Sequence, residues 1–131
     1  MKVVINNDFG GFGLSHKATL RYAELKGIEI YSFKDKEGFG SGLVPYEEGE
    51  GKEPYLIYYY TTPDRQDHTF FSDRDIPRND PHLVQVVEEL GLEADGSHAD
   101  LKVVEIPDDV DWQIEEYDGS EWVSEVHRTW K

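Results

Sequence analysis

The chain has 131 residues and no cysteine, and its 28 acidic residues outnumber its 13 Lys and Arg residues, for a formal net charge of −15. This composition excludes disulfides and thiolate metal sites. The negative charge argues against a nucleic-acid-binding module, which normally carries a basic surface. The length predicts one domain over residues 1–131. No apolar run approaches the roughly 20 residues of a membrane span, so we expect a cytoplasmic protein that contacts neither membrane nor nucleic acid directly.

The N-terminal stretch predicts a strand, a glycine-rich turn and a capped helix in succession. Residues 2–5 are mostly β-branched, which is typical of a short buried strand. Three glycines then lie between residues 10 and 13, where they give the backbone unusual freedom. Ser15 is a favourable N-cap for a helix over residues 16–26, because its hydroxyl can accept from an N–H in the first turn. Gly27 follows where a left-handed C-cap is expected.

A second helix and further strands follow along the chain. Asp80 caps this helix, Pro81 opens it, and an apolar stripe runs along it to Gly91. Asp118-Gly119 indicates a hairpin turn. The expected strands cover residues 28–33, 55–61, 101–106, 112–117 and 121–130, the last with a helix from residue 120 as an alternative, and residues 34–54 form a long loop or a loose hairpin. The pattern predicts an α+β domain with two helices and a mixed or antiparallel sheet of five or six strands.

Three segments carry a family resemblance. The first is Val4-Ile5-Asn6 followed by the Gly-Gly-Phe-Gly-Leu-Ser run of residues 10–15, and the second runs from Arg78 to Gly91. The third is the Ile-Pro-Asp-Asp-Val-Asp-Trp run of residues 106–112, with Glu-Tyr-Asp-Gly at 116–119 and His-Arg-x-Trp at 127–130. Together they resemble a family of small uncharacterised proteins encoded by bacteriophages, prophages and some bacteria. The resemblance implies no catalytic residue, and it implies a phage accessory role inside a bacterial host cell, such as blocking a host defence protein.

The junction between the first strand and the first helix is a candidate anion site. Free N–H groups and the helix dipole favour an anion where a glycine turn meets a helix N-terminus. The glycines form only part of a dinucleotide fingerprint, and no Lys-Ser or Lys-Thr pair makes a P-loop. The alternative is a tight connection that simply needs small residues. The predicted ligand-binding residues are Gly10, Gly11, Phe12, Gly13 and Ser15, together with Arg78 and Arg128, whose guanidinium groups could grip a phosphate or pair instead with surface acids.

The C-terminal part is strongly acidic. Residues 103–126 contain nine acids and neither Lys nor Arg. The candidate acidic partner face consists of Asp108, Asp109, Asp111, Glu115, Glu116 and Glu121. Such a face could imitate DNA or bind a basic host protein, or it could be a solvated surface. Asp108, Asp109 and Asp111 could hold a divalent metal, but their spacing matches no known loop, so we expect neither metal nor cofactor.

These observations lead to three hypotheses on function. The first is a binding protein that captures a small anionic, nucleotide-like ligand without turnover, in a site that could lie between subunits of a homo-oligomer. The second is an acidic inhibitor or DNA mimic that binds a basic host protein. The third is a small nucleotide-processing enzyme, in which a histidine would act with Asp8 or Ser15, although no nucleophile motif supports it.

Overall fold

The computed structural model describes residues 1–36, 42–49, 53–54 and 56–126. Within these residues the chain forms two α-helices and eight strands, which confirms the predicted α+β class. The strands make three antiparallel sheets rather than one. The elements are β1 Lys2–Asn6, α1 His16–Lys26, β2 Tyr31–Asp35, β3 Leu43–Pro45, β4 Tyr58–Tyr60, β5 Phe70–Phe71, α2 Pro81–Leu90, β6 Leu101–Glu105, β7 Trp112–Tyr117 and β8 Ser120–Glu125, with 3-10 helices η1 Asp67–Thr69, η2 Asp73–Asp75 and η3 Gly91–Ala94.

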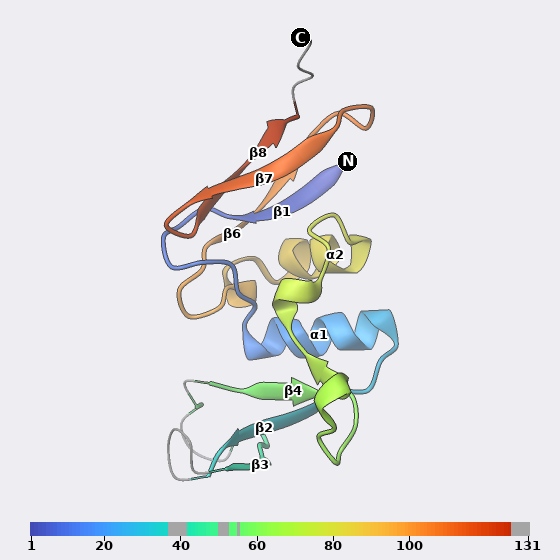
Figure 1. The fold of residues 1–131 in the computed structure, drawn as a ribbon, viewed down its shortest axis with the longest axis vertical. Coiled ribbons are helices and arrows are strands. Elements are labelled where there is room, and N and C mark those ends of the chain that lie inside the picture. The colour runs from blue at the N-terminus through green and yellow to red at the C-terminus, as the bar shows by residue number, and fades with distance from the viewer. Residues whose placement is uncertain (37–41, 50–52, 55, 127–131) are drawn as a thin grey trace.

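The helices divide the strands into separate sheets. Figure 1 shows the hairpin β7–β8 at one end, then β1 with β6, then α2 and α1, and the four-stranded sheet β3-β2-β4-β5 at the other end. Because the two helices lie between β1 and the four-stranded sheet, these strands cannot join one continuous sheet. This position of the helices is why the expected single sheet of five or six strands is wrong.

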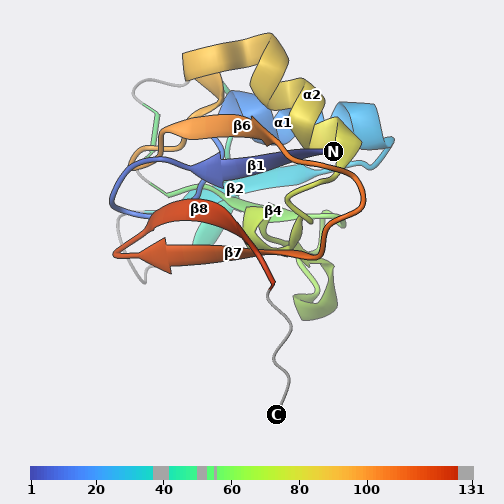
Figure 2. The same cartoon turned by 90° about the horizontal axis from the view of Figure 1, so that it is seen from above.

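The strand β1 forms the centre of one half of the molecule. Val3 and Val4 are fully buried, and β1 pairs antiparallel with β6 from Lys2↔Glu105 to Asn6↔Leu101. Its other side lies next to β8, as Figure 2 shows from above. The apolar stripe of α2 packs on this layer, and Leu83 and Val86 are fully buried there. The predicted strands at residues 2–5 and 101–106 and the predicted second helix are therefore confirmed.

Asp80 begins α2 and joins it to α1. One carboxylate oxygen accepts from the N–H groups of His82 and Leu83, which is the predicted N-cap. The other oxygen accepts from the Tyr22 hydroxyl at 2.9 Å and from Lys26 Nζ at 3.0 Å. Burial, helped by Asp80, raises the pKa of the Tyr22 hydroxyl to about 12. Burial alone would raise the pKa of Asp80, yet the bonds from Lys26 and Tyr22 hold it below its usual range, so the carboxylate stays charged.

The four-stranded sheet differs from its prediction mainly in the bounds of its strands. The second strand covers Tyr31–Asp35 instead of residues 28–33, and it forms a hairpin with β3 within the segment expected as a loop or loose hairpin. The strand expected over residues 55–61 is limited to Tyr58–Tyr60 among the described residues, and Tyr55 lies outside them. It lies between β2 and β5, so its expected interior position is confirmed.

The hairpin β7–β8 has the predicted two-residue turn. Asp118 and Gly119 both have positive φ, at 51° and 92°, and Tyr117 pairs with Ser120 across the turn. Positive φ at both central residues matches the right-handed twist of the two strands. The segment after residue 120 is therefore a strand as far as Glu125, and residues 127–131 lie outside the described part. No helix in the described residues is long and apolar enough to cross a membrane.

Candidate functional site

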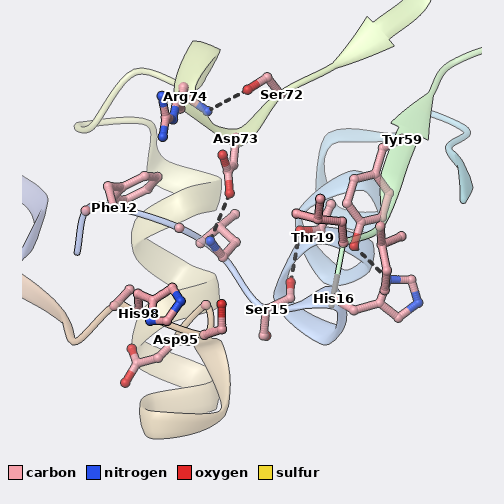
Figure 3. A pocket seen from close by; sticks show the side chains of 18 of the residues that line it. Phe12, Ser15, His16, Thr19, Tyr59, Ser72, Asp73, Arg74, Asp95 and His98 are labelled. Carbon is pink, nitrogen blue, oxygen red and sulfur yellow. Dashed lines mark hydrogen bonds between the residues drawn. The ribbon is translucent and has the colours of Figure 1, made fainter. Parts of the chain in front are cut away.

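A pocket of about 540 Å³ lies at the junction between β1 and α1. The glycine loop, which we define as residues 10–15, forms one wall of it. Figure 3 shows side chains of several surrounding segments that converge on this space. The remaining lining residues are His16, Thr19, Glu53, Pro54, Leu56, Ile57, Tyr59, Phe70, Phe71, Ser72, Asp73, Arg74, Asp95, Gly96, Ser97, His98 and Ala99. Five of the predicted ligand-binding residues, Gly10, Gly11, Phe12, Gly13 and Ser15, therefore line a single cavity.

Ser15 caps α1 as predicted, and its hydroxyl is engaged with the protein itself. It accepts from the N–H of Ala18 at 3.1 Å and donates to the carbonyl of Glu93 at 2.6 Å. The N–H of Ser15 donates to the carbonyl of Ala94 at 2.9 Å. These bonds join the start of α1 to η3, so the helix N-terminus is held in place without a ligand.

Part of the hydrogen-bonding capacity of the glycine loop is also used internally. The N–H of Gly10 donates to the carbonyl of Asp118 at 3.3 Å, and the N–H of Leu14 donates to Oδ2 of Asp73 at 2.9 Å. Among the described residues, the N–H groups of Phe12 and Gly13 have no hydrogen-bond partner. The N–H group of Gly11 likewise has none, so three N–H groups of the loop are unpaired within the described residues, and the protein itself supplies a carboxylate beside them.

The glycines also allow three backbone segments to pack directly against one another. A Cβ atom on Gly96 would lie 2.9 Å from the carbonyl carbon and oxygen of Gly13, and the N–H of Gly96 donates to that oxygen. A Cβ on Gly119 would collide with the backbone nitrogens of Gly10 and Gly11. This packing supports the alternative considered from sequence, a tight connection that needs small residues, and the same packing shapes one wall of the pocket.

Arg78 contributes to the structure rather than to the cavity. Its guanidinium donates to both carboxylate oxygens of Glu121, at 2.6 and 2.9 Å, and to the carbonyl of Val4 at 3.3 Å. The guanidinium also stacks on the Phe12 ring, 3.7 Å from its centroid. Because Glu121 already neutralises this charge, the expected phosphate-binding role of Arg78 is corrected. The second predicted arginine, Arg128, lies outside the described residues.

His16 lies at the opposite end of the pocket from Phe12. Its Nδ1 is 2.7 Å from the Tyr59 hydroxyl, its Nε2 is 3.5 Å from Glu48, and its side chain is only 5% exposed. The ring also packs against the rings of Tyr46 and Tyr59, and Figure 3 shows its hydrogen bond with the Tyr59 hydroxyl. Burial lowers the pKa of His16, against the opposing effects of Glu48 and Glu53. Burial raises the pKa of Tyr59 far above its usual range, so both side chains are neutral at pH 7.

The lining carries more negative than positive charge. Glu53, Asp73 and Asp95 are acidic, whereas Arg74 is the only Lys or Arg among the lining residues that the structure describes. The guanidinium of Arg74 is exposed and has no acidic partner among the described residues. Within the same residues, no group of three His, Asp or Glu could hold a metal ion, including the alternative set Asp108, Asp109 and Asp111.

The acidic partner face is divided between several surfaces. Glu115 and Glu116 point to opposite sides of the hairpin, because successive residues of a strand alternate. Glu121 is buried against Arg78, so it is corrected from a surface acid to an internal one. Asp108 forms an ion pair with the N-terminal amine, whereas Asp109 and Asp111 are exposed.

Comparison of the chain with protein-family models, with curated proteins and with solved structures finds no match. The resemblance to phage and prophage proteins, the expected action on a host defence and the expected homo-oligomer therefore stay predictions. The pocket and the hairpin are the observations from which function can be inferred.

Sequence reasoning found one wall of the pocket and missed the others. Phe70, Phe71 and Asp73 lie in a segment for which the sequence predicted no strand or helix, and residues 95–99 carried no motif. The Ser72-Asp73 sequence is a local signal for a short helical turn, because the Ser72 hydroxyl can cap it by accepting from the N–H of Arg74. Nothing local, however, indicates that this turn lies against residue 14.

The close approach of two backbones gives a matched pair of glycine variants. We expect Gly96→Ala to lower the free energy of unfolding by about 2 kcal/mol or more, because the added Cβ overlaps the backbone of Gly13 and the neighbours must shift. Gly13→Ala is the control, since its Cβ would lie 4.0 Å from the nearest atoms and should change stability by less than about 1 kcal/mol. Urea unfolding measures both. Equal destabilisation by the two variants would contradict the close contact between the backbones of Gly96 and Gly13.

The lowered pKa of His16 makes a prediction for stability at mildly acidic pH. An unfolded His has a pKa of about 6.5, and burial lowers the folded value, so the unfolded chain binds more protons below pH 6.5. The contribution of neutral His16 to the free energy of unfolding is therefore complete above that pH, and it is lost as the pH falls through the pKa of His16 in the folded protein. Urea unfolding from pH 8 to pH 5 should show a smaller loss of stability for His16→Gln than for the parent chain. His68→Gln is the control, because His68 is exposed. If the difference in free energy of unfolding between the parent and His16→Gln does not change with pH, the prediction is refuted.

Proposed function

We propose that this protein captures a small nucleotide-like ligand, without turning it over, in the pocket between the glycine loop and the four-stranded sheet. The observation that carries the proposal is the two-sided lining of the pocket. One side is the glycine loop, in which the N–H groups of Gly11, Phe12 and Gly13 have no hydrogen-bond partner among the described residues, and the other side consists of aromatic and aliphatic residues from the segments around β4 and β5. A planar base needs the second kind of surface, and a sugar or phosphate needs the first.

The size and aromatic content of the pocket suit such a ligand. About 540 Å³ lies within the range of small-molecule sites, which is roughly 300 to 1,000 Å³. Phe70 lines the pocket and remains 49% exposed, with its ring edge-on to Tyr60 at a centroid distance of 5.4 Å. An exposed ring that is already held by a neighbour can stack on a base at a low cost in conformational entropy.

Capture is favoured over turnover by the partners of the potentially catalytic groups. The Ser15 hydroxyl both accepts from Ala18 and donates to Glu93, so it is fully used as a helix cap. His16 is bonded to Tyr59 instead of to a nucleophile. Asp8, the other expected partner, accepts from the N–H of Phe9. Sequestering a small signalling molecule without destroying it would also suit the accessory role that the sequence resemblance implies.

The aromatic side of the pocket gives the test. Isothermal titration calorimetry against a panel of nucleosides, linear nucleotides and cyclic nucleotides should find at least one ligand with a micromolar dissociation constant. Phe70→Ala should raise the dissociation constant of that ligand by about tenfold, because base stacking on one aromatic side chain contributes roughly 1–3 kcal/mol. Leu92→Ala is the control, since Leu92 is 84% exposed and does not line the pocket. The absence of any binding at high micromolar concentration would refute the proposal.

A second candidate function rests on the outer surface of the hairpin β7–β8. Tyr117 is 73% exposed and Trp122 is 46% exposed, and both share this surface with Glu115, which accepts from the Trp122 indole N–H at 3.0 Å. Exposed aromatic residues next to acids are suited to a basic protein partner, which is the inhibitor or DNA-mimic hypothesis.

This second candidate predicts salt-sensitive binding to basic proteins. The immobilised protein should retain basic proteins from a bacterial lysate at 50 mM salt and release most of them at 300 mM, because exposed charges are screened. The variant Glu115→Gln removes a charge from this surface and should retain less basic protein than the parent chain. Glu47→Gln removes the same charge from an exposed residue elsewhere and should retain as much as the parent. Equal loss with both variants would show only non-specific attraction by the net charge.

A further inference from the structure

The position that a ligand phosphate was expected to occupy is taken by a carboxylate of the protein. Asp73 extends from η2 toward the glycine loop, and its Oδ2 accepts from the N–H of Leu14 at 2.9 Å, as Figure 3 shows. This contact lies directly before Ser15, the cap of α1. The N–H group of Leu14, next to the start of α1 where an anion is favoured, therefore already has an anionic partner.

The rest of the lining adds to this negative charge instead of offsetting it. Asp95 and Glu53 also line the pocket, and Arg74, which is exposed, is the one Lys or Arg among the lining residues that the structure describes. Oδ1 of Asp95 accepts from the N–H of Leu101, and this bond fixes the position of the Asp95 side chain beside the pocket. The whole protein carries a formal net charge of −15, which extends the unfavourable potential for an anion beyond the pocket. A phosphate bound at the glycine loop would lie next to Asp73 and be repelled.

An uncharged ligand is not repelled by Asp73 and can form a hydrogen bond with it. Among the described residues, Oδ1 of Asp73 has no hydrogen-bond partner, and a carboxylate oxygen can accept from a hydroxyl or an amino group. A nucleoside supplies such donors on its sugar and base, together with a planar ring for the aromatic side of the pocket. The free N–H groups of Phe12 and Gly13 can in turn donate to neutral sugar or base oxygens.

We propose that the pocket selects an uncharged nucleoside over its phosphates, and that Asp73 is the residue that determines this specificity. This inference rests on the proposed function and refines it, because the ligand expected from sequence was anionic. Asp73 acts as an internal substitute for the phosphate at the loop, and it rejects a second anion there while it accepts a hydroxyl or amino donor.

The test compares nucleosides with their 5′-monophosphates at constant ionic strength by calorimetry. In the parent protein, the nucleoside should bind at least about tenfold tighter than its monophosphate. Asp73→Asn keeps an oxygen that can accept from the N–H of Leu14 and removes the charge. It should therefore reduce the ratio of the monophosphate's dissociation constant to that of the nucleoside about tenfold, mainly through tighter binding of the monophosphate. Asp75→Asn is the matched control, because it removes the same charge from the same 3-10 helix at a side chain that does not line the pocket.

The outcomes separate this inference from the proposed function. If nucleoside and monophosphate bind the parent equally, or the monophosphate binds tighter, the pocket is a nucleotide-like site and the selectivity proposal is overturned. If Asp75→Asn narrows the ratio as much as Asp73→Asn, net charge and not Asp73 sets the preference, which also overturns it. If no compound binds the parent or the Asp73→Asn variant, the proposed function fails and the inference fails with it. Thermal unfolding of both variants checks that each remains folded.

Discussion

The ion pair between the half-buried Arg78 and the buried Glu121 is the interaction on which the arrangement of this molecule depends. The bidentate bonds join the segment before α2 to β8, and Glu121 also accepts from the N–H of Asn6 in β1. Two charges out of water are tolerated only when nearly all of their hydrogen-bonding capacity is used. Here the guanidinium additionally donates to Val4 and stacks on Phe12. Loss of Arg78 would leave the Glu121 carboxylate buried without a compensating charge, so the pair fixes which segments lie together.

Asn6 extends the same network to the turn of the hairpin and to β6. Its side-chain amide donates to the carbonyls of Asp8 and Gly119, and its side-chain oxygen accepts from the N–H of Asp100. Asn6 is fully buried, and every polar group of its side chain has a partner. The turn at Gly119 is thereby held against the glycine loop, where only a glycine fits. The pocket therefore has a wall whose position is set by a rigid network, as a preorganised site requires.

Local patterns were sufficient for most elements, whereas the features they missed depend on contacts between residues far apart in the sequence. The helix caps at Ser15 and Asp80 and the turn at Asp118-Gly119 were predictable because each depends on neighbours within three residues. The number of sheets was not predictable, because it depends on where the helices pack. The role of Arg78 was not predictable either, since its partner lies 43 residues away and looked like any other surface acid.

The same limitation applies to the net charge, which describes the composition and not the surface. Several carboxylates serve as acceptors for donors that the fold would otherwise leave unsatisfied: Asp80 at the start of α2, Asp73 at the glycine loop, Asp95 at β6 and Glu121 at Arg78. An unpaired buried donor is costly, and a charged acceptor is a strong partner for it. Part of the acidic excess is therefore structural, so fewer carboxylates are available for a surface that imitates DNA than the net charge suggests.

The use of carboxylates as internal acceptors also determines what the pocket can recognise. A glycine loop before a helix is usually considered an anion site because its N–H groups are free. In this chain one of those groups binds Asp73, so the loop presents both donors and an acceptor to the cavity. A surface with both functions matches a ligand that has hydroxyl and carbonyl groups better than one that has only phosphate oxygens. The chemistry of the site thus follows from a residue 59 positions away from the loop and not from the glycine motif itself.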